Sequence, residues 1–114
     1  MFSTGVDIEK IDRFNDINQD FINKVYTKNE IEYCNNKKNP AQHFAARFCA
    51  KEAVVKALTS LNIKLPNLKE IEVISQHDGV PVIKLLCIDI PFDIKLSLSH
   101  CEDTAIAFVV VTGK

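Results

Sequence analysis

The chain has 114 residues, of which 46% are hydrophobic and 25% are charged, and its formal net charge is −1. This length is typical of one domain, and the apolar fraction is enough to form a core without metals or disulfides. A charge so close to zero excludes the broad positive field of a nucleic-acid-binding protein. No apolar run is long enough to span a membrane, and residues 1–7 do not have the pattern of a signal peptide. We therefore expect one cytoplasmic domain over residues 1–114, with neither nucleic acid nor membrane as a partner.

The cysteines do not form a metal-binding or redox motif. No two of them are spaced as CxxC, so zinc-ribbon and thioredoxin-like sites are excluded. We expect reduced thiols at all four positions, which are Cys34, Cys49, Cys87 and Cys101.

The N-terminal half of the chain predicts a strand followed by helices. Residues 2–8 have the composition of a short strand, and residues 9–15 form a polar segment that could open a helix. Residues 20–36 are predicted to be helical, with Thr27 and Glu30 at capping-box spacing in the second part. The longest predicted helix runs from Pro40 or Ala41 to about Ser60, because proline is tolerated at the first helical position.

This long helix is apolar on two faces. One face has small side chains spaced four, three and four residues apart, namely Ala46, Ala50, Ala53 and Ala57. That spacing predicts an element packed closely against the helix. The opposite face has bulky side chains, namely Phe44, Phe48, Val55 and Leu58. The helix is therefore expected to be central, and its few polar residues are candidates for function.

The C-terminal half predicts two hairpins. Residues 71–75 and 80–86 are predicted strands joined by the His77-Asp78-Gly79 turn, in which Asp-Gly is a strong hairpin signal. Residues 94–100 and 105–112 form a second predicted hairpin around residues 101–104. One strand, then helices, then a run of strands predicts an α+β fold, with a mainly antiparallel sheet packed by the long central helix.

Three polar clusters remain once the core positions are removed. The first is Asp7 at the end of the first strand, and the others are Arg47, Lys51, Glu52 and Lys56 on the central helix and Ser97, Ser99 and His100 on a late strand. Glu52 and Lys56 share a helix face and could simply form a solvated ion pair. Lys51, however, projects among the bulky apolar residues, where it must either reach water or meet an anion.

The other two clusters also have structural and functional interpretations. Asp7 could be a helix N-cap, or it could be a ligand of a hard metal ion. Mg²⁺ prefers one or two carboxylates with phosphate oxygens and water, so Asp7 and Glu52 would suffice if the fold brought them together. His100 could be a structural hydrogen-bonding residue, and Ser99 could either contact phosphate or face solvent on an edge strand.

Taken together, these residues resemble the holo-acyl-carrier-protein synthase family, the short trimeric bacterial class of 4′-phosphopantetheinyl transferases. The most specific motif is the segment from Ala46 to Ala57, which is similar to the family helix R-F-x-A-K-E-A-x-x-K-A. Two further motifs match in order and spacing: Gly5-Val6-Asp7-Ile8 followed by Arg13, and Leu96-Ser97-Leu98-Ser99-His100 followed by Ala105-Ile106-Ala107-Phe108-Val109. The resemblance covers essentially the whole chain.

The resemblance implies an enzyme that transfers the 4′-phosphopantetheine group of coenzyme A to a serine of apo acyl carrier protein. This reaction would depend on Mg²⁺, release 3′,5′-ADP and support fatty acid biosynthesis. The resemblance also implies homotrimers with sites between subunits. A small domain so rich in apolar residues agrees with this expectation, because it can bury more surface by self-association.

The resemblance assigns roles residue by residue. Asp7 and Glu52 match the acidic pair that holds Mg²⁺, and Lys56 matches the lysine near the reacting phosphate. Positions that line the coenzyme A site correspond to Arg47, Lys51, Lys56, Ser99 and His100. Arg13 matches a residue that meets the acidic carrier protein, and Lys24 and Lys28 are basic residues in the same segment. The general base is expected to be either Glu52 or a metal-bound water held by Glu52 and Asp7.

The chain departs from the family pattern after the long helix. Family members commonly have a glycine-rich loop there, whereas the segment from Thr59 to Pro66 contains no glycine. Two other functions stay open at this point: a non-catalytic relative that binds acyl carrier protein or a nucleotide, and an unrelated α+β binding domain. The non-catalytic relative would be expected to lack an acid or the motif lysine, yet Asp7, Glu52 and Lys56 are all present. An assay of Mg²⁺-dependent transfer distinguishes both alternatives from the enzyme.

Overall fold

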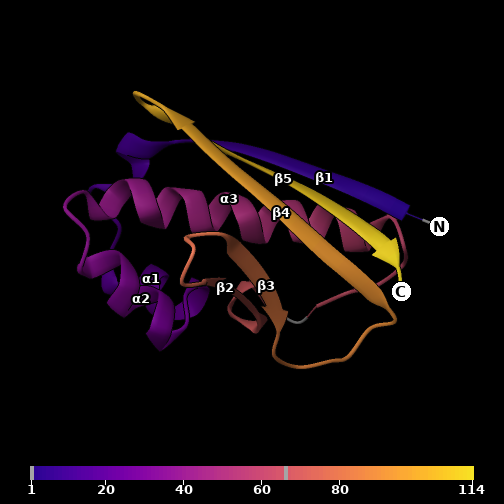
Figure 1. The fold of residues 1–114 in the computed structure, drawn as a ribbon. Coiled ribbons are helices and arrows are strands. Elements are labelled where there is room, and N and C mark those ends of the chain that lie inside the picture. The colour runs from indigo at the N-terminus through magenta and orange to yellow at the C-terminus, as the bar shows by residue number, and fades with distance from the viewer. Residues whose placement is uncertain (1, 66) are drawn as a thin grey trace.

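A long helix, α3 (Pro40–Thr59), lies between a three-stranded antiparallel sheet and a two-stranded hairpin (Figure 1). The sheet has the strand order β1 (Phe2–Lys10), β5 (Thr104–Gly113), β4 (Phe92–Cys101), and the hairpin pairs β2 (Ile71–Ser75) with β3 (Pro81–Leu85). This computed structural model describes residues 2–65 and 67–114. The predicted α+β class is confirmed, and the two predicted hairpins belong to separate sheets.

The segment predicted as one helix over residues 20–36 forms two short helices, α1 (Gln19–Val25) and α2 (Lys28–Asn35). The helix stops because Tyr26 and Thr27 have extended backbones. Thr27 is the N-cap of α2, and the predicted capping box is confirmed: the Glu30 amide donates to Thr27 Oγ1 at 3.3 Å, and the Thr27 amide donates to Glu30 Oε1 at 2.8 Å. An N-cap residue needs an extended backbone, so the cap that starts α2 also ends α1.

Two short 3₁₀ segments complete the chain: η1 (Ile11–Phe14), after β1, and η2 (Leu68–Glu70), before β2. The Asp78-Gly79 turn between β2 and β3 is confirmed, with Gly79 at a positive φ of 83°.

Among residues 2–65 and 67–114, none of the helices has the length and hydrophobicity needed to span a bilayer. All four cysteines are free thiols.

The small-residue face of α3 is packed against β1, as predicted. A β-carbon added to Gly5 would lie 1.9 Å from the Ala53 carbonyl oxygen and 3.0 Å from the Ala57 amide nitrogen. Ala50, Ala53 and Ala57 are fully buried, whereas Ala46 is half-buried. From β5, the side chains Ala105, Ala107, Val109 and Val111 complete this interface. Small residues on both sides let α3 and the sheet approach closely enough to bring polar side chains of both together.

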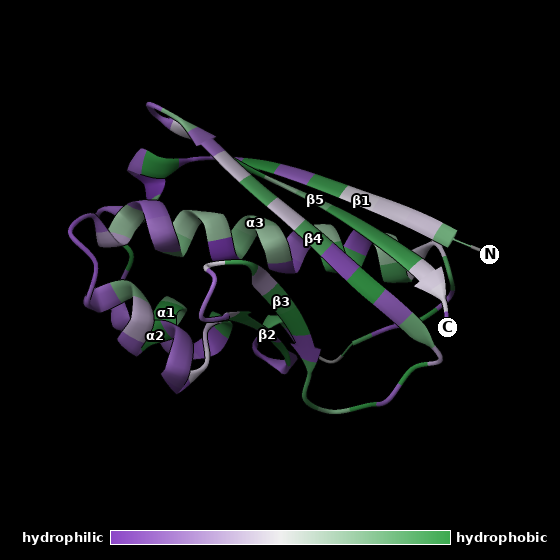
Figure 2. Cartoon of the chain, viewed as in Figure 1, coloured by the Kyte–Doolittle hydropathy of each residue, from purple (hydrophilic) through white to green (hydrophobic). Residues whose placement is uncertain are grey.

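On the other face of the sheet, β1 and β5 carry apolar side chains that none of the described residues covers. Strand β5 is hydrophobic over almost its whole length, whereas β4 alternates (Figure 2). The register pairs Val6 with Phe108 and Ile8 with Ile106 on this outer face. Its large exposed residues are Phe2, Val6, Ile8, Ile106 and Phe108. An exposed apolar patch of this kind is typical of an interaction surface.

Candidate active site

The structure brings together Asp7 of β1 with Glu52 and Lys56 of α3. Lys56 Nζ lies 3.3 Å from Asp7 Oδ1 and donates to the Val6 carbonyl oxygen at 2.9 Å. Asp7 follows Gly5 by two positions on the strand, so both face α3. The close packing at Gly5 therefore places the Asp7 carboxylate against the next turns of the helix. We call Asp7, Glu52 and Lys56 the acidic cluster.

The electrostatics of this cluster fit a cation site. Burial raises the pKa of Glu52, and the negative charge of Asp7 raises it further, while Lys56 lowers it. Asp7 Oδ2 is buried and has no hydrogen-bond partner among the described residues. Asp7 is not a helix N-cap, because Lys10 occupies that position for η1. Two neighbouring carboxylates with one lysine leave negative charge that a divalent cation would compensate.

Glu9 is a third carboxylate beside this cluster, and the sequence analysis did not select it. It lies two residues after Asp7 on β1 and is half-buried. Burial and the neighbouring Asp7 carboxylate raise the pKa of Glu9, and the ion pair with Arg13 opposes this shift. The period-two alternation of strand side chains could have identified Glu9 from the sequence, because it puts Glu9 on the same face of the strand as Asp7. Even so, no three Asp, Glu, His or Cys side chains in the described parts of the chain form a group that could hold a metal by themselves.

A second polar site surrounds Arg47, which is only 3% exposed. Its Nη2 atom donates to Ser75 Oγ at 2.9 Å, and its guanidinium carbon lies 3.9 Å from the ring centroid of Tyr33. A pocket of about 240 Å³ opens beside these residues. Residues of α2, α3, β4 and the β2–β3 hairpin line it, among them Tyr33, His43, Arg47, Ser75, Ser99 and His100. We call this the arginine pocket.

The arginine pocket is electropositive. Burial lowers the pKa of His43, and the charges of Arg47, Lys37 and His100 lower it further. The hydrogen bond with Ser75 and the charges of Arg47 and Lys37 lower the pKa of Tyr33. Lys37 Nζ lies 4.6 Å from the ring centroid of Tyr33. A concave site whose charged groups are cationic is suited to a phosphate or another anion.

Ser99 and His100 reach the arginine pocket from β4. His100 Nε2 lies 3.0 Å from Gln42 Nε2. Among the other lining residues, His43 and Arg47 are four residues apart and so share a face of α3. That spacing could have identified His43 from the sequence, whereas nothing local indicated Tyr33 or Ser75.

The structure does not place Lys51 at either site. Its side chain is fully buried, and Lys51 Nζ lies 2.8 Å from Glu30 Oε1. The anion that this lysine was expected to meet is therefore an internal carboxylate of α2. We do not retain Lys51 as a coenzyme A contact.

The three residues expected at a protein-docking surface are all exposed. Arg13 is on η1, Lys24 on α1 and Lys28 at the start of α2. Arg13 forms an ion pair with Glu9, four residues earlier, and its side chain is 64% exposed. Arg13 therefore connects this surface to the carboxylates of β1.

Asn62 has a left-handed backbone in the segment after α3. Asn62 has a positive φ of 62°, and the Ile63 amide donates to the Leu58 carbonyl oxygen at 3.0 Å. Glycine usually occupies such a left-handed position at a helix C-terminus, and asparagine is the common substitute. The chain therefore turns here without a glycine. Pro66, the last residue of this segment, lies outside the described residues.

Comparison with known sequences gives full-length matches. The model of the 4′-phosphopantetheinyl transferase superfamily matches residues 3–109. The holo-[acyl-carrier-protein] synthase of Thermodesulfovibrio yellowstonii is 43% identical over 112 residues, covering 95% of this chain and 96% of that protein. The protein of the same name from Chlamydia muridarum is 42% identical over 122 residues, covering 99% and 98%.

Solved structures give the same result. The crystal structure of a holo-(acyl-carrier-protein) synthase from Bacillus anthracis in complex with CoA (3′,5′-ADP) superposes with a TM-score of 0.84 at 26% identity, covering 98% of this chain and 96% of that one. The Helicobacter pylori holo-[acyl-carrier-protein] synthase in complex with coenzyme A has a TM-score of 0.76 at 26% identity, covering 96% and 99%. The fold and the three sequence motifs therefore lead to the same group of enzymes.

Proposed function

We propose that this chain, which belongs to the 4′-phosphopantetheinyl transferase superfamily and is a transferase of the holo-acyl-carrier-protein synthase type, moves the phosphopantetheine group of coenzyme A to a serine of apo acyl carrier protein. The proposed reaction requires Mg²⁺, takes place in the cytoplasm and supports fatty acid biosynthesis. The observation that carries this proposal is the acidic cluster, in which Lys56 Nζ lies 3.3 Å from Asp7 Oδ1 beside Glu52. The arginine pocket supplies the cationic side chains that a phosphate of coenzyme A requires.

We propose that the complete site lies between two subunits. Arg47 and Lys56 are nine residues apart on α3, so their side chains point in directions about 180° apart around the helix axis. Lys56 contacts β1, whereas Arg47 contacts Ser75 of β2. One coenzyme A molecule can meet both only if the acidic cluster of one subunit adjoins the arginine pocket of its neighbour. The uncovered outer face of β1 and β5 supplies an apolar surface for the expected homotrimer.

The proposed metal ligands are Asp7 and Glu52. Asp7 Oδ2 has no hydrogen-bond partner among the described residues, and the negative charge of Asp7 contributes to the raised pKa of Glu52. When bound there, Mg²⁺ would neutralise phosphate charge and polarise the reacting phosphoryl group. Because two carboxylates leave most of the coordination sphere open, the diphosphate of coenzyme A and water would supply the remaining oxygens.

The chain's own residues position the reacting groups. The hydroxyl oxygen of the carrier serine forms a bond to the phosphorus on the pantetheine side of the coenzyme A diphosphate. The bond from that phosphorus to the bridging oxygen breaks, and 3′,5′-ADP leaves with the bonding electrons. Lys56 offsets the negative charge that develops on the diphosphate. The serine proton passes either to Glu52 or to a water that Glu52 and Asp7 hold at the proposed cation site.

Mass spectrometry of the carrier protein tests this proposal. We expect apo acyl carrier protein, incubated with this enzyme, coenzyme A and Mg²⁺, to gain the mass of one phosphopantetheine. A chelator should stop the reaction, and Asp7→Ala and Glu52→Ala should each remove most of it without loss of the fold. Full transfer by either variant in excess chelator would refute the metal site. Coenzyme A binding without any gain in carrier mass would favour a non-catalytic binding protein.

A further inference from the structure

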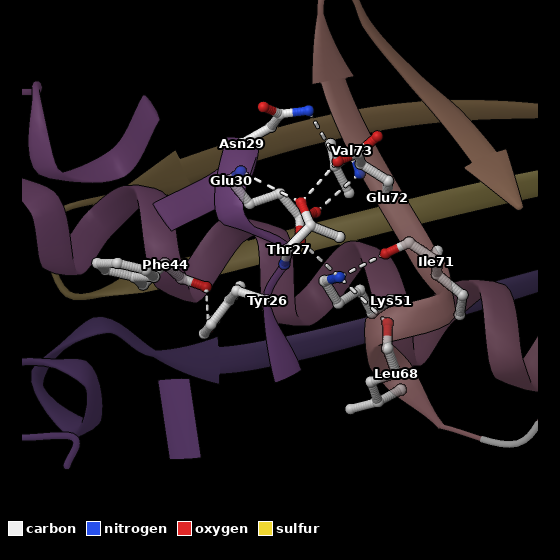
Figure 3. Close-up of polar contacts among 10 residues, drawn as sticks. All are labelled: Tyr26, Thr27, Asn29, Glu30, Phe44, Lys51, Leu68, Ile71, Glu72 and Val73. Atoms are coloured by element: carbon white, nitrogen blue, oxygen red, sulfur yellow. Dashed lines mark hydrogen bonds and ion pairs between the residues drawn. The ribbon is translucent and has the colours of Figure 1, made fainter. Parts of the chain in front are cut away.

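A buried ion pair lies on a different face of α3 from the acidic cluster. Lys51 of α3 and Glu30 of α2 are joined at 2.8 Å between Nζ and Oε1, and both side chains are 0% exposed. Figure 3 shows that the lysine ends among groups from the neighbouring elements. Burying two charges is costly unless each is fully hydrogen-bonded. The hydrogen-bond partners of Lys51 and Glu30 therefore determine which elements the pair holds together.

Lys51 uses all the donors that it has. A lysine ammonium has three N–H donors. They meet the Glu30 carboxylate, the Leu68 carbonyl oxygen at 3.1 Å and the Ile71 carbonyl oxygen (Figure 3). These acceptors belong to α2, η2 and the first residue of β2. One side chain of α3 therefore fixes three other elements.

Glu30 is equally well satisfied. Its Oε1 atom accepts from the Thr27 amide and its Oε2 atom from the Val73 amide, each at 2.8 Å. The same carboxylate thus completes the capping box of α2 and binds the backbone of β2. Glu72 extends the network, because its Oε2 atom accepts from Thr27 Oγ1 at 2.6 Å. This network is specific to one relative arrangement of α2, α3 and β2.

The network limits how α3 can turn about its own axis. Arg47 lies four residues before Lys51 on the same face, and it donates to Ser75 at the other end of β2. Lys51 and Arg47 therefore attach the helix to both ends of one strand through directional bonds. On the opposite side, Gly5 packs against the smooth backbone of Ala53, which fixes the separation from β1 but resists rotation less. Lys51 directly precedes Glu52, and adjacent helical side chains are about 100° apart, so rotation at Lys51 would move Glu52 by the same angle.

We propose that Lys51 and Glu30 are positioning residues of the transfer site: their buried pair fixes the rotation of α3 and thereby holds Glu52 next to Asp7. This inference rests on the proposed function only in taking Asp7 and Glu52 as the metal ligands. It gives Lys51 a role that contact with coenzyme A does not explain, and it gives Glu30 a role besides helix capping.

The test compares three variants with wild type. Lys51→Met removes all three donors at similar length but leaves the Glu30 charge buried and unpaired. The double variant Lys51→Met/Glu30→Gln has no unpaired charge, and its glutamine can still accept one of the two amide bonds. Val54→Ala is the control, because Val54 is fully buried on α3 and contributes packing without belonging to the network. Urea unfolding measures the stability of each variant.

The readout is binding of Mn²⁺, as a probe for Mg²⁺, followed by electron paramagnetic resonance in the presence of coenzyme A and without carrier protein. We expect the dissociation constant for Mn²⁺ to rise about tenfold in both network variants, the scale seen when residues that support metal ligands are removed. The double variant should recover stability relative to Lys51→Met but not Mn²⁺ affinity. Val54→Ala should lose stability and bind Mn²⁺ as wild type does. If Lys51→Met does not fold, Mn²⁺ binding by Lys51→Met/Glu30→Gln tests the proposal on its own.

A double-mutant cycle tests whether Lys51 acts through Glu52. Adding Lys51→Met to Glu52→Gln should weaken Mn²⁺ binding no further than Glu52→Gln alone does. Three outcomes would each overturn the inference: wild-type Mn²⁺ affinity in Lys51→Met/Glu30→Gln, additive effects of Lys51→Met and Glu52→Gln in the cycle, or no Mn²⁺ binding by the wild-type protein. Mn²⁺ binding that follows this pattern in a protein without transfer activity would support it while refuting the proposed function.

Discussion

Gly5 lies so close to Ala53 that a β-carbon at position 5 would be 1.9 Å from the Ala53 carbonyl oxygen. This contact joins β1 to α3 at the level where Asp7 follows on the strand and where Glu52 and Lys56 flank Ala53 and Ala57 on the helix. The acidic cluster therefore depends on a backbone approach that only glycine permits. The glycine of the Gly5-Val6-Asp7 motif serves the site without contacting it.

Gly5→Ala should destabilise the protein by about 3 kcal/mol or more, because an added methyl group here meets helix backbone that cannot move aside as a flexible side chain would. Gly113→Ala is the matched control, since a β-carbon at Gly113 would meet nothing within 4 Å. Urea unfolding of both variants measures the difference. Equal midpoints for Gly5→Ala and wild type would mean that β1 and α3 are further apart than the structure has them.

His43 should make stability depend on pH. Its pKa is lowered from the ordinary value of 6.5 by burial and by nearby positive charge. A group with a lowered pKa binds protons more readily in the unfolded chain, so stability should fall as pH falls through 6.5 toward the lowered value. His43→Gln should flatten this part of the profile. Thermal unfolding of both proteins between pH 7.5 and 5.5 tests this, and parallel profiles would contradict it.

The outer face of β1 and β5 should be the surface through which subunits associate. We expect wild type to sediment as a trimer and Phe108→Glu to sediment as a monomer, because a carboxylate at the centre of an apolar interface would be buried without a partner. Val80→Glu is the control, since Val80 is also exposed but lies in the β2–β3 hairpin. A wild-type protein that sediments as a monomer at micromolar concentration would contradict both the predicted trimer and the site shared between subunits.

Arg13→Glu should raise KM for the carrier protein far more than KM for coenzyme A, because the exposed Arg13 is expected to meet the acidic protein substrate and not coenzyme A. Exposed charges are screened over about 8 Å at physiological ionic strength, so the effect should shrink as salt is added. Lys69→Glu, the same charge reversal on η2, should leave the carrier KM unchanged. Equal carrier KM values for wild type and Arg13→Glu at low salt would remove Arg13 from the docking surface.

Features set by neighbouring residues could be predicted from the sequence. The Asp78-Gly79 turn and the Thr27–Glu30 capping box depend on contacts within four residues, and both are present in the structure. The extent of α3 followed from its apolar spacing and from Pro40 at its start. Asp7 and Glu52 were selected together because both are carboxylates suited to Mg²⁺ and because both match the family motifs, and in the structure the charge of Asp7 acts on Glu52.

Features set by distant contacts could not be predicted in the same way. Lys51 was expected either to reach water or to meet an anion, and nothing in the sequence distinguished a buried glutamate from a phosphate. Glu30 was already explained by its capping box, so its second role was hidden. Similarly, the pairing of β2 with β3 was predicted, but their separation from the other three strands was not, because it depends on contacts between distant parts of the chain.

Mixing two defective variants tests the shared site most directly. Asp7→Ala should disable the acidic cluster and Arg47→Met the arginine pocket, so each variant alone should transfer little phosphopantetheine. After subunit exchange in an equal mixture, about one quarter of the interfaces in a homotrimer would combine an intact acidic cluster with an intact arginine pocket. We predict that carrier modification, followed by mass spectrometry, recovers to about this fraction of the wild-type rate. If the mixture exchanges subunits and remains as inactive as the separate variants, the two sites do not act across a subunit interface, and the account is contradicted.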